Sequence, residues 1–274
     1  MDIGSVGTFL LQVMLCATLL MPSLGCSDKG AEPVMTEVDC EQAAADATLD
    51  IVGLRDRGAC AWLGLRYAEP ITPSGRFLPP ELRPLGSGSI TATDFGADCL
   101  QSNNPMSEQP QSEDCLFLNI WAPGESSDGT LQRQLPVMVW IHGGGFTQGA
   151  GNWSLYNGAA FARQGVVLVA INYRLGALGF AAPDGVTHDN GTELAGNLGV
   201  RDTLTALEWV QQHIARFGGD PDRVTVFGES AGAWMTCALL AAGAGDDGLL
   251  HRAIMESGGC YIASRERAAE FGQK

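Results

Sequence analysis

From residue 137 onward the chain repeats one pattern: a short, continuous apolar run rich in valine and isoleucine, then a segment with helical periodicity. Such runs are typical of strands that helices cover on both faces, whereas half-exposed strands alternate polar and apolar residues. Strands that alternate with helices favour an α/β fold with a largely parallel sheet. The predicted strands are residues 61–68, 116–122, 137–142, 166–172, 224–228 and 252–257.

Three segments between or after these strands have the features of helices. Residues 157–165 suit a short helix that Gly165 ends, and a second helix is expected from Ser230 to about Ala242. The longest helix is predicted over Leu198–Phe217 because its apolar side chains recur on one helical stripe. The members of that stripe are Val200, Leu204, Leu207, Val210, Ile214 and Phe217.

The first 50 residues differ from this pattern. Residues 1–25 contain an apolar run, "FLLQVMLCATLLM", of signal-peptide length, followed by the small residues Ser23 and Gly25. They therefore predict export, with cleavage before Cys26. A cysteine at this position is also typical of a bacterial lipoprotein, but Ser23 stands where a large aliphatic residue is usual, so lipidation of Cys26 stays open. Residues 26–50 are polar and acidic, and we expect a linker or a loosely held arm.

The charge balance excludes several classes of partner. The chain has 16 basic and 31 acidic residues, a net charge of −15, and no cluster of lysine and arginine. A surface this acidic repels nucleic acid and anionic membranes, so neither is expected as a partner. The cysteines and histidines show no zinc-binding spacing, and we expect no metal and no cofactor.

The motif "GESAG", residues 228–232, follows the predicted strand 224–228 and opens a predicted helix. It matches G-x-S-x-G, the nucleophile elbow, in which the serine occupies a strained turn and the flanking glycines avoid collisions. The motif alone is weak in a chain with 36 glycines. Its position between an apolar strand and a helix strengthens the interpretation of Ser230 as a nucleophile.

A second motif, "WIHGGGFTQG", follows the predicted strand 137–142. Three consecutive glycines leave backbone N–H groups uncovered by side chains, so that an oxygen atom can approach them. Donors of this kind stabilise the oxyanion that forms when a serine attacks an acyl carbon, each by a factor of about 10²–10³. A merely flexible glycine loop is the alternative, and the elbow downstream favours an oxyanion hole.

With these motifs in place, the chain resembles the type-B carboxylesterases, the α/β-hydrolase family that includes cholinesterases and fungal lipases. The resemblance extends from about residue 50 to the end, so residues 51–274 resemble the N-terminal part of such a domain. The matching blocks are "GLRYAEP" (64–70), "SEDCLFLNIWAP" (112–123), "PVMVWIHGGGF" (136–146), "INYRLGALGF" (171–180), "GNLGVRDTLTALEWVQQHI" (196–214) and "FGGDPDRVTVFGESAGA" (217–233).

The resemblance implies a truncated α/β-hydrolase fold and assigns roles to several residues. It implies Ser230 as the nucleophile and the N–H groups of Gly144, Gly145 and Ala231 as the oxyanion hole. Glu229 matches the acidic residue that commonly precedes the serine, without a role that the sequence defines. The family's triad acid and histidine lie far downstream of the serine, whereas only residues 231–274 follow it here.

The histidines of this chain do not match the family's general base. His142 belongs to the glycine motif and is expected to serve loop structure, and His213 is expected to be a surface or packing residue on its helix. His188 lies in a polar segment, and His251 precedes the last predicted strand. We therefore expect this chain to lack the triad acid and histidine and to be a poor esterase when isolated.

Eight cysteines are present, and six remain once Cys16 in the leader and Cys26 are set aside. An even number in an exported protein favours disulfides. The resemblance pairs Cys99 with Cys115 around a loop near the active site, a loop without the tryptophan that choline-binding members use. Two further pairs are open, with free thiols as the alternative: Cys237 with Cys260, and Cys40 with Cys60.

Two classes of function follow from this resemblance. The first is a serine carboxylic ester hydrolase with a small-molecule ester as substrate, working through an acyl-enzyme. The second is a non-catalytic binding or adhesion module, a role that some relatives serve. Those relatives typically lose the serine or the oxyanion glycines, and both are present here. The expected location is outside the cytoplasm: periplasmic, secreted, or attached to the outer membrane through Cys26 if the source is bacterial.

Overall fold

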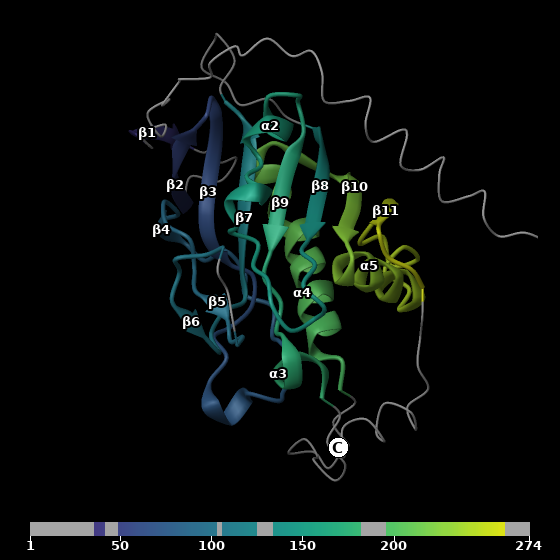
Figure 1. The fold of residues 1–274 in the computed structure, drawn as a ribbon. Coiled ribbons are helices and arrows are strands. Elements are labelled where there is room, and N and C mark those ends of the chain that lie inside the picture. The colour runs from purple at the N-terminus through teal and green to yellow at the C-terminus, as the bar shows by residue number, and fades with distance from the viewer. Residues whose placement is uncertain (1–35, 42–48, 103–105, 125–133, 182–195, 261–274) are drawn as a thin grey trace, which may run out of the picture. The chain divides into compact units, whose positions relative to one another are not determined.

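Strands far apart in the chain meet in one mixed sheet, whose order is β1-β2-β3-β7-β9-β8-β10-β11, with β4 paired to β2 beside this path (Figure 1). This computed structural model describes residues 36–41, 49–102, 106–124, 134–181 and 196–260. The chain divides into two compact units, Met1–Val34 and Met35–Lys274, and every described residue belongs to the second.

The bounds of the elements are as follows. The strands are β1 (Thr36–Glu41), β2 (Leu49–Asp56), β3 (Ala59–Arg66), β4 (Gly88–Thr91), β5 (Asp98–Cys99), β6 (Gln111–Ser112), β7 (Phe117–Pro123), β8 (Leu135–Ile141), β9 (Val167–Ile171), β10 (Gly219–Glu229) and β11 (Arg252–Glu256). The helices are α2 (Ala159–Ala162), α3 (Gly176–Phe180), α4 (Leu198–His213) and α5 (Ala231–Ala241), with 3-10 turns η1 (Pro73–Gly75), η2 (Ser154–Tyr156) and η3 (Ile214–Phe217).

All six predicted strands and the three predicted helices form, with shifted ends. The sheet is only partly parallel. Strands β9, β8, β10 and β11 pair in parallel, as expected of strands joined by helical crossovers. Strands β1, β2, β3 and β7 pair antiparallel, and β7 also meets β9 antiparallel. The apolar runs predicted burial on both faces, which is common to both kinds of pairing, and so could not distinguish them.

Two described parts of the expected polar arm, residues 36–41 and 49–50, are in strands. Thr36–Glu41 forms β1 and pairs with β2, which itself begins at Leu49. Within β1, Cys40 is fully buried and is bonded to Cys60 of β3. The polar composition of residues 36–41 did not indicate this strand, because a disulfide and one neighbouring strand can hold a segment that has little apolar surface of its own.

Alternating side chains of the central strands bury both faces of the sheet. Val137, Val139 and Ile141 of β8 belong to the larger core, which α4 joins through Trp209 and Val210. Trp140 of the same strand belongs to the smaller core on the other face. This explains why β8 is apolar at almost every position.

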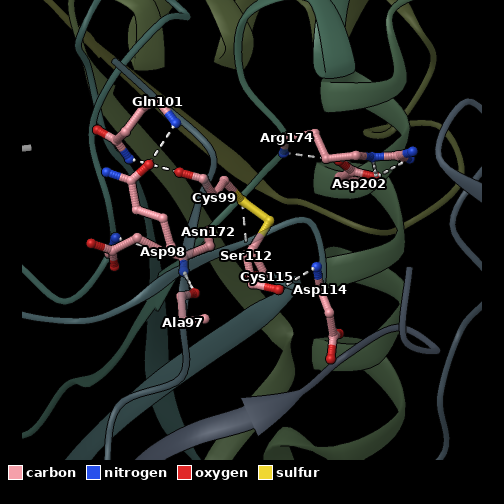
Figure 2. The surroundings of a disulfide bond; sticks show 12 residues. Ala97, Asp98, Cys99, Gln101, Ser112, Asp114, Cys115, Asn172, Arg174 and Asp202 are labelled. Atoms are coloured by element: carbon pink, nitrogen blue, oxygen red, sulfur yellow. Dashed lines mark hydrogen bonds and ion pairs between the residues drawn. A yellow bond between two sulfur atoms is a disulfide. The ribbon is translucent and has the colours of Figure 1, made fainter. Parts of the chain in front are cut away.

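Helix α4 is fixed to the chain segment after β9 by a buried ion pair. The Arg174 guanidinium donates to both carboxylate oxygens of Asp202, with a shortest distance of 2.6 Å between Nη2 and Oδ1. Figure 2 shows the two side chains facing each other. The Arg174 backbone N–H also donates to Asp202. The ion pair therefore fixes the position of α4, whose side chains pack against one face of the central strands.

Three disulfides are formed, and their pairings are those that the sequence analysis considered: Cys40–Cys60, Cys99–Cys115 and Cys237–Cys260. Within the described ranges, no helix combines the length and the hydropathy needed to span a bilayer. The expected signal peptide, Cys16, Cys26 and His188 lie outside the described residues.

Candidate active site

Ser230 occupies the bend between β10 and α5. Its backbone has φ 53° and ψ −115°, a left-handed φ that non-glycine residues seldom adopt. Its N–H donates to the carbonyl of Glu256 in β11 at 2.9 Å, so the neighbouring strand holds the bend in place. The strained strand-to-helix turn expected at this serine is therefore present, and the half-buried side chain lies at the carboxyl end of the parallel strands.

The two glycines of the elbow, residues 228–232, leave no room for a side chain. A Cβ on Gly232 would lie 2.0 Å from the carbonyl oxygen of Ile141, and one on Gly228 would lie 2.5 Å from the carbonyl carbon of Gly232. Real Cβ atoms do not approach other atoms this closely. The elbow is thus possible only because β10 and α5 come together through bare backbone.

The glycine loop, residues 143–149, lies directly against this elbow. A Cβ on Gly143 would lie 2.8 Å from the Glu229 carbonyl oxygen and 3.3 Å from Cβ of Ser230. Gly144 and Gly145 have left-handed φ values of 108° and 61°. Among the described residues, neither of their N–H groups nor that of Ala231 finds an acceptor. Three free donors therefore come from the two segments that meet at Ser230, and Ala231 adds the positive end of the α5 dipole.

His142 supports the glycine loop rather than the serine. Its Nδ1–H donates to the Gly143 carbonyl at 2.8 Å, and its ring stacks on Tyr173, whose hydroxyl donates to the His142 carbonyl at 2.8 Å. Burial lowers the pKa of His142 to about 4, so the imidazole is neutral at pH 7. The expected structural role fits these contacts.

The other described histidines also have structural partners. His213 packs edge-on against Trp209, and the Leu85 N–H points to its Nε2 at 3.5 Å. Nδ1 of His251 accepts from the Val224 N–H at 3.2 Å. Within the described ranges, no histidine is hydrogen-bonded to the Ser230 hydroxyl, and no group of three or more candidate metal ligands is present.

Glu229 points toward an open cavity of about 360 Å³ whose lining includes Trp140, Tyr156, Phe227 and Glu256. Glu229 and Glu256 are direct partners in the β10–β11 ladder. Burial and, to a lesser extent, the charge of Glu229 raise the pKa of Tyr156. A Cβ on Gly143 would lie 2.8 Å from Oε2 of Glu229, so this carboxylate lies next to the first residue of the glycine loop.

Two buried asparagines that the motifs did not indicate hold the residues that follow the glycine loop. Asn172 accepts from the Gly151 N–H at 2.8 Å and donates to the Ala97 carbonyl at 3.1 Å. Asn119 donates to the Gly151 carbonyl at 3.5 Å. Asn119 interrupts the apolar strand sequence "LFLNIW", and Asn172 ends the apolar run "VVLVAIN". A buried amide within such a run is the signal that could have identified them, because it needs hydrogen-bond partners.

The disulfide Cys99–Cys115 closes a loop beside this region (Figure 2). The short strands β5 and β6 pair within the loop. Arg66 forms an ion pair with Asp114 next to the second cysteine. The loop is therefore ordered at its base by one covalent bond, one ladder and one ion pair.

Comparison with known proteins agrees with this geometry. The sequence model of the Carboxylesterase family matches residues 50–272. The chain is 44% identical to the para-nitrobenzyl esterase of Bacillus subtilis (strain 168) over 80% of this chain and 44% of that protein. It is 40% identical to the cocaine esterase of Homo sapiens over 90% of this chain and 44% of that protein.

Solved structures show the same relationship. The carboxylesterase of Geobacillus stearothermophilus superposes with a TM-score of 0.72 and 41% identity, covering 82% of this chain and 45% of that one. The chain therefore spans less than half the length of these relatives, and the described sheet and helices are an α/β-hydrolase fold.

Proposed function

This chain belongs to the carboxylesterase family, and from that premise we propose that it carries the nucleophile and the oxyanion hole of a serine carboxylic ester hydrolase. The single observation that carries the proposal is the contact between the glycine loop and the elbow at Gly143 and Ser230. It supports the proposal because, among the described residues, the loop that carries the Gly144 and Gly145 N–H groups lies against the serine at the strand-to-helix bend, and Ala231 follows that serine directly.

In the proposed reaction, the Ser230 hydroxyl attacks the carbonyl carbon of the ester and its proton passes to a general base. The carbonyl oxygen becomes an oxyanion that accepts from the N–H groups of Gly144, Gly145 and Ala231. Collapse of this intermediate releases the alcohol, which takes up the proton, and leaves an acyl group on Ser230. Water then attacks the acyl-enzyme by the same steps and releases the carboxylic acid.

We place the general base and its orienting acid outside the described residues. His142 is a poor candidate because its Nδ1–H is engaged, its Nε2 is buried, and its pKa is about 4. A ring nitrogen of each of the other two described histidines, His213 and His251, accepts from a backbone N–H group, that of Leu85 or Val224. Without a base, the oxyanion hole and substrate binding would leave only about 10³–10⁴-fold acceleration over water.

A small carboxylic ester is the proposed class of substrate. The relatives carry names that refer to para-nitrobenzyl and cocaine esters, which differ widely from each other. We therefore propose the reaction class and assign no particular ester. The three disulfides support a further proposal, that the protein works outside the cytoplasm, with residues 1–25 as its signal peptide and Cys26 as the candidate anchor.

A fluorophosphonate probe tests the proposal on the whole protein, because it reacts with activated serines. We expect labelling at Ser230, loss of labelling in Ser230→Ala, and loss of para-nitrophenyl acetate hydrolysis in the same variant. Ser257→Ala is the matched control, since Ser257 also has a left-handed φ (52°) at the end of a neighbouring strand. Absence of labelling and hydrolysis in the folded whole protein would instead favour a non-catalytic binding module.

A further inference from the structure

We infer that Gln101 is a positioning residue of the oxyanion hole, an inference that rests on the proposed function. Gln101 follows Cys99 within the disulfide-closed loop (Figure 2). Its side chain exchanges two hydrogen bonds with one residue of the glycine loop: the Gly149 N–H donates to Oε1 at 2.9 Å, and Nε2 donates to the Gly149 carbonyl at 3.0 Å.

This arrangement copies a β-ladder. In an antiparallel hydrogen-bonded pair, two residues exchange both N–H···O bonds, and the carboxamide presents the same neighbouring donor and acceptor as a peptide group. Nε2 of Gln101 also donates to the Cys99 carbonyl at 3.0 Å, and its own N–H donates to Oε1 of Gln111 at 2.9 Å. The side chain is thus held at its base while it holds Gly149.

Gly149 in turn packs against the peptide that supplies an oxyanion donor. A Cβ on Gly149 would lie 2.3 Å from Nδ1 of His142 and 2.7 Å from the Gly143 carbonyl oxygen. In a trans peptide the C=O and the following N–H point in opposite directions. Fixing the Gly143 carbonyl between His142 and Gly149 therefore sets the direction of the Gly144 N–H.

The two residues just before Gly149 also orient an oxyanion donor, through the Gly144 carbonyl. The Gly144 carbonyl accepts from the N–H groups of Thr147 and Gln148, each at 3.1 Å, which orients the next N–H, that of Gly145. Because Gln148 precedes Gly149, a shift of Gly149 moves these acceptor–donor pairs too. Gln101 therefore acts on the oxyanion hole indirectly, because it holds Gly149 and Gly149 fixes the backbone that carries the donors.

The test compares Gln101→Met with Gln211→Met. Methionine has about the same length as glutamine and makes neither bond. Gln211, on α4, is a matched control because its Nε2 also donates to two backbone carbonyls, those of Pro221 and Leu249. We expect the Gly149 amide hydrogen to exchange about tenfold faster in Gln101→Met, as the loss of its acceptor implies, and to be unchanged in Gln211→Met.

Steady-state kinetics of the whole protein give the second measurement. Misplaced donors weaken binding of the transition state more than binding of the ester, so we expect kcat to fall about tenfold in Gln101→Met with KM within twofold. Unfolding midpoints report whether either variant is globally destabilised.

The two measurements separate this inference from the proposed function. Unchanged Gly149 exchange, or an unchanged kcat in a protein whose hydrolysis depends on Ser230, would overturn the role of Gln101 and leave the esterase intact. Absence of any Ser230-dependent hydrolysis would overturn the esterase, and the oxyanion role of Gln101 with it, even if Gly149 exchange responds as expected. A fall in kcat that Gln211→Met reproduces would also contradict the inference.

Discussion

The elbow and the glycine loop meet at Ser230, yet they are held in different ways. The elbow is fixed by its own glycines, because Gly228 and Gly232 allow two backbones to touch where any Cβ would collide. The glycine loop is fixed from outside, by Gln101, Tyr173 and His142 and by the anchors of the next residues. The elbow therefore depends on close contact between backbones, and the glycine loop depends on hydrogen bonds from other segments.

This difference predicts how each half fails. A side chain added at Gly228 or Gly232 should destabilise the whole fold, since two contacting backbones leave it no room. A substitution among the anchors of the glycine loop should leave the fold in place and loosen the donors.

The largest effect is expected from Gly232→Ala. Helix propensity alone would favour alanine in α5 by about 1 kcal/mol. A Cβ 2.0 Å from the Ile141 carbonyl outweighs this, and we expect a loss of stability of about 3 kcal/mol or more together with loss of Ser230 labelling. Urea unfolding and the fluorophosphonate probe measure the two outcomes. Gly245→Ala is the control, because its Cβ would have 4.0 Å of clearance; an equal loss there would refute the steric account.

Removing one disulfide at a time should show that the stability of the fold and the order of the glycine loop depend on different bonds. Replacing both cysteines of Cys99–Cys115, or both of Cys237–Cys260, should cost about 3 kcal/mol in either case, because the closed loops are of similar length. Only the first pair adjoins Gln101, so only its loss should speed amide exchange at Gly149. Thermal unfolding and hydrogen exchange provide the measurements. Equal exchange rates in the two double variants would show that the disulfide-closed loop does not hold the glycine loop.

Lowering the pH should destabilise the folded protein through protonation of His142, which supports the glycine loop. Its pKa falls from 6.5 in the unfolded chain to about 4 in the folded protein because it is buried, so between these values the unfolded state binds more protons. His142 therefore costs no stability above pH 6.5. As the pH falls toward 4, the free energy of unfolding decreases by up to about 3 kcal/mol.

Urea midpoints measured from pH 7 to pH 4 test this dependence, with the wild-type protein compared with His142→Gln. The slope in this window should flatten in the variant. His213→Gln serves as the comparison, because burial also lowers the pKa of His213 to about 4 but that side chain is only half buried. A slope that survives both substitutions would assign the acid sensitivity to other groups.

The smallest effect is expected from Asn172→Leu. The change leaves the Gly151 N–H and the Ala97 carbonyl without partners, and we expect a loss of about 2 kcal/mol. Chemical denaturation measures it, and the Cys99–Cys115 bond should remain. A neutral result would mean that Asn172 contributes nothing to the region after the glycine loop.

The elbow could be predicted from ten consecutive residues, because its requirements are local: an apolar strand, a serine between two glycines, and a helix. The central strands were equally readable, since burial on both faces requires an apolar residue at nearly every position. For the same reason their orientation was not readable. Parallel and antiparallel strands buried on both faces have the same apolar composition, and only the order of pairing distinguishes β9 from β7.

The anchors of the glycine loop were decided by the tertiary structure alone. Gln101 lies 48 residues before Gly149, and a glutamine in a polar loop sequence has no periodicity that would indicate a partner. The strand β1 escaped prediction in the same way, because Cys40 stands between two acidic residues and its bond to Cys60 joins separate strands. A tight turn and burial on both faces restrict the residue types at consecutive positions and so leave a pattern in the sequence, whereas a single hydrogen bond or disulfide between distant segments leaves none.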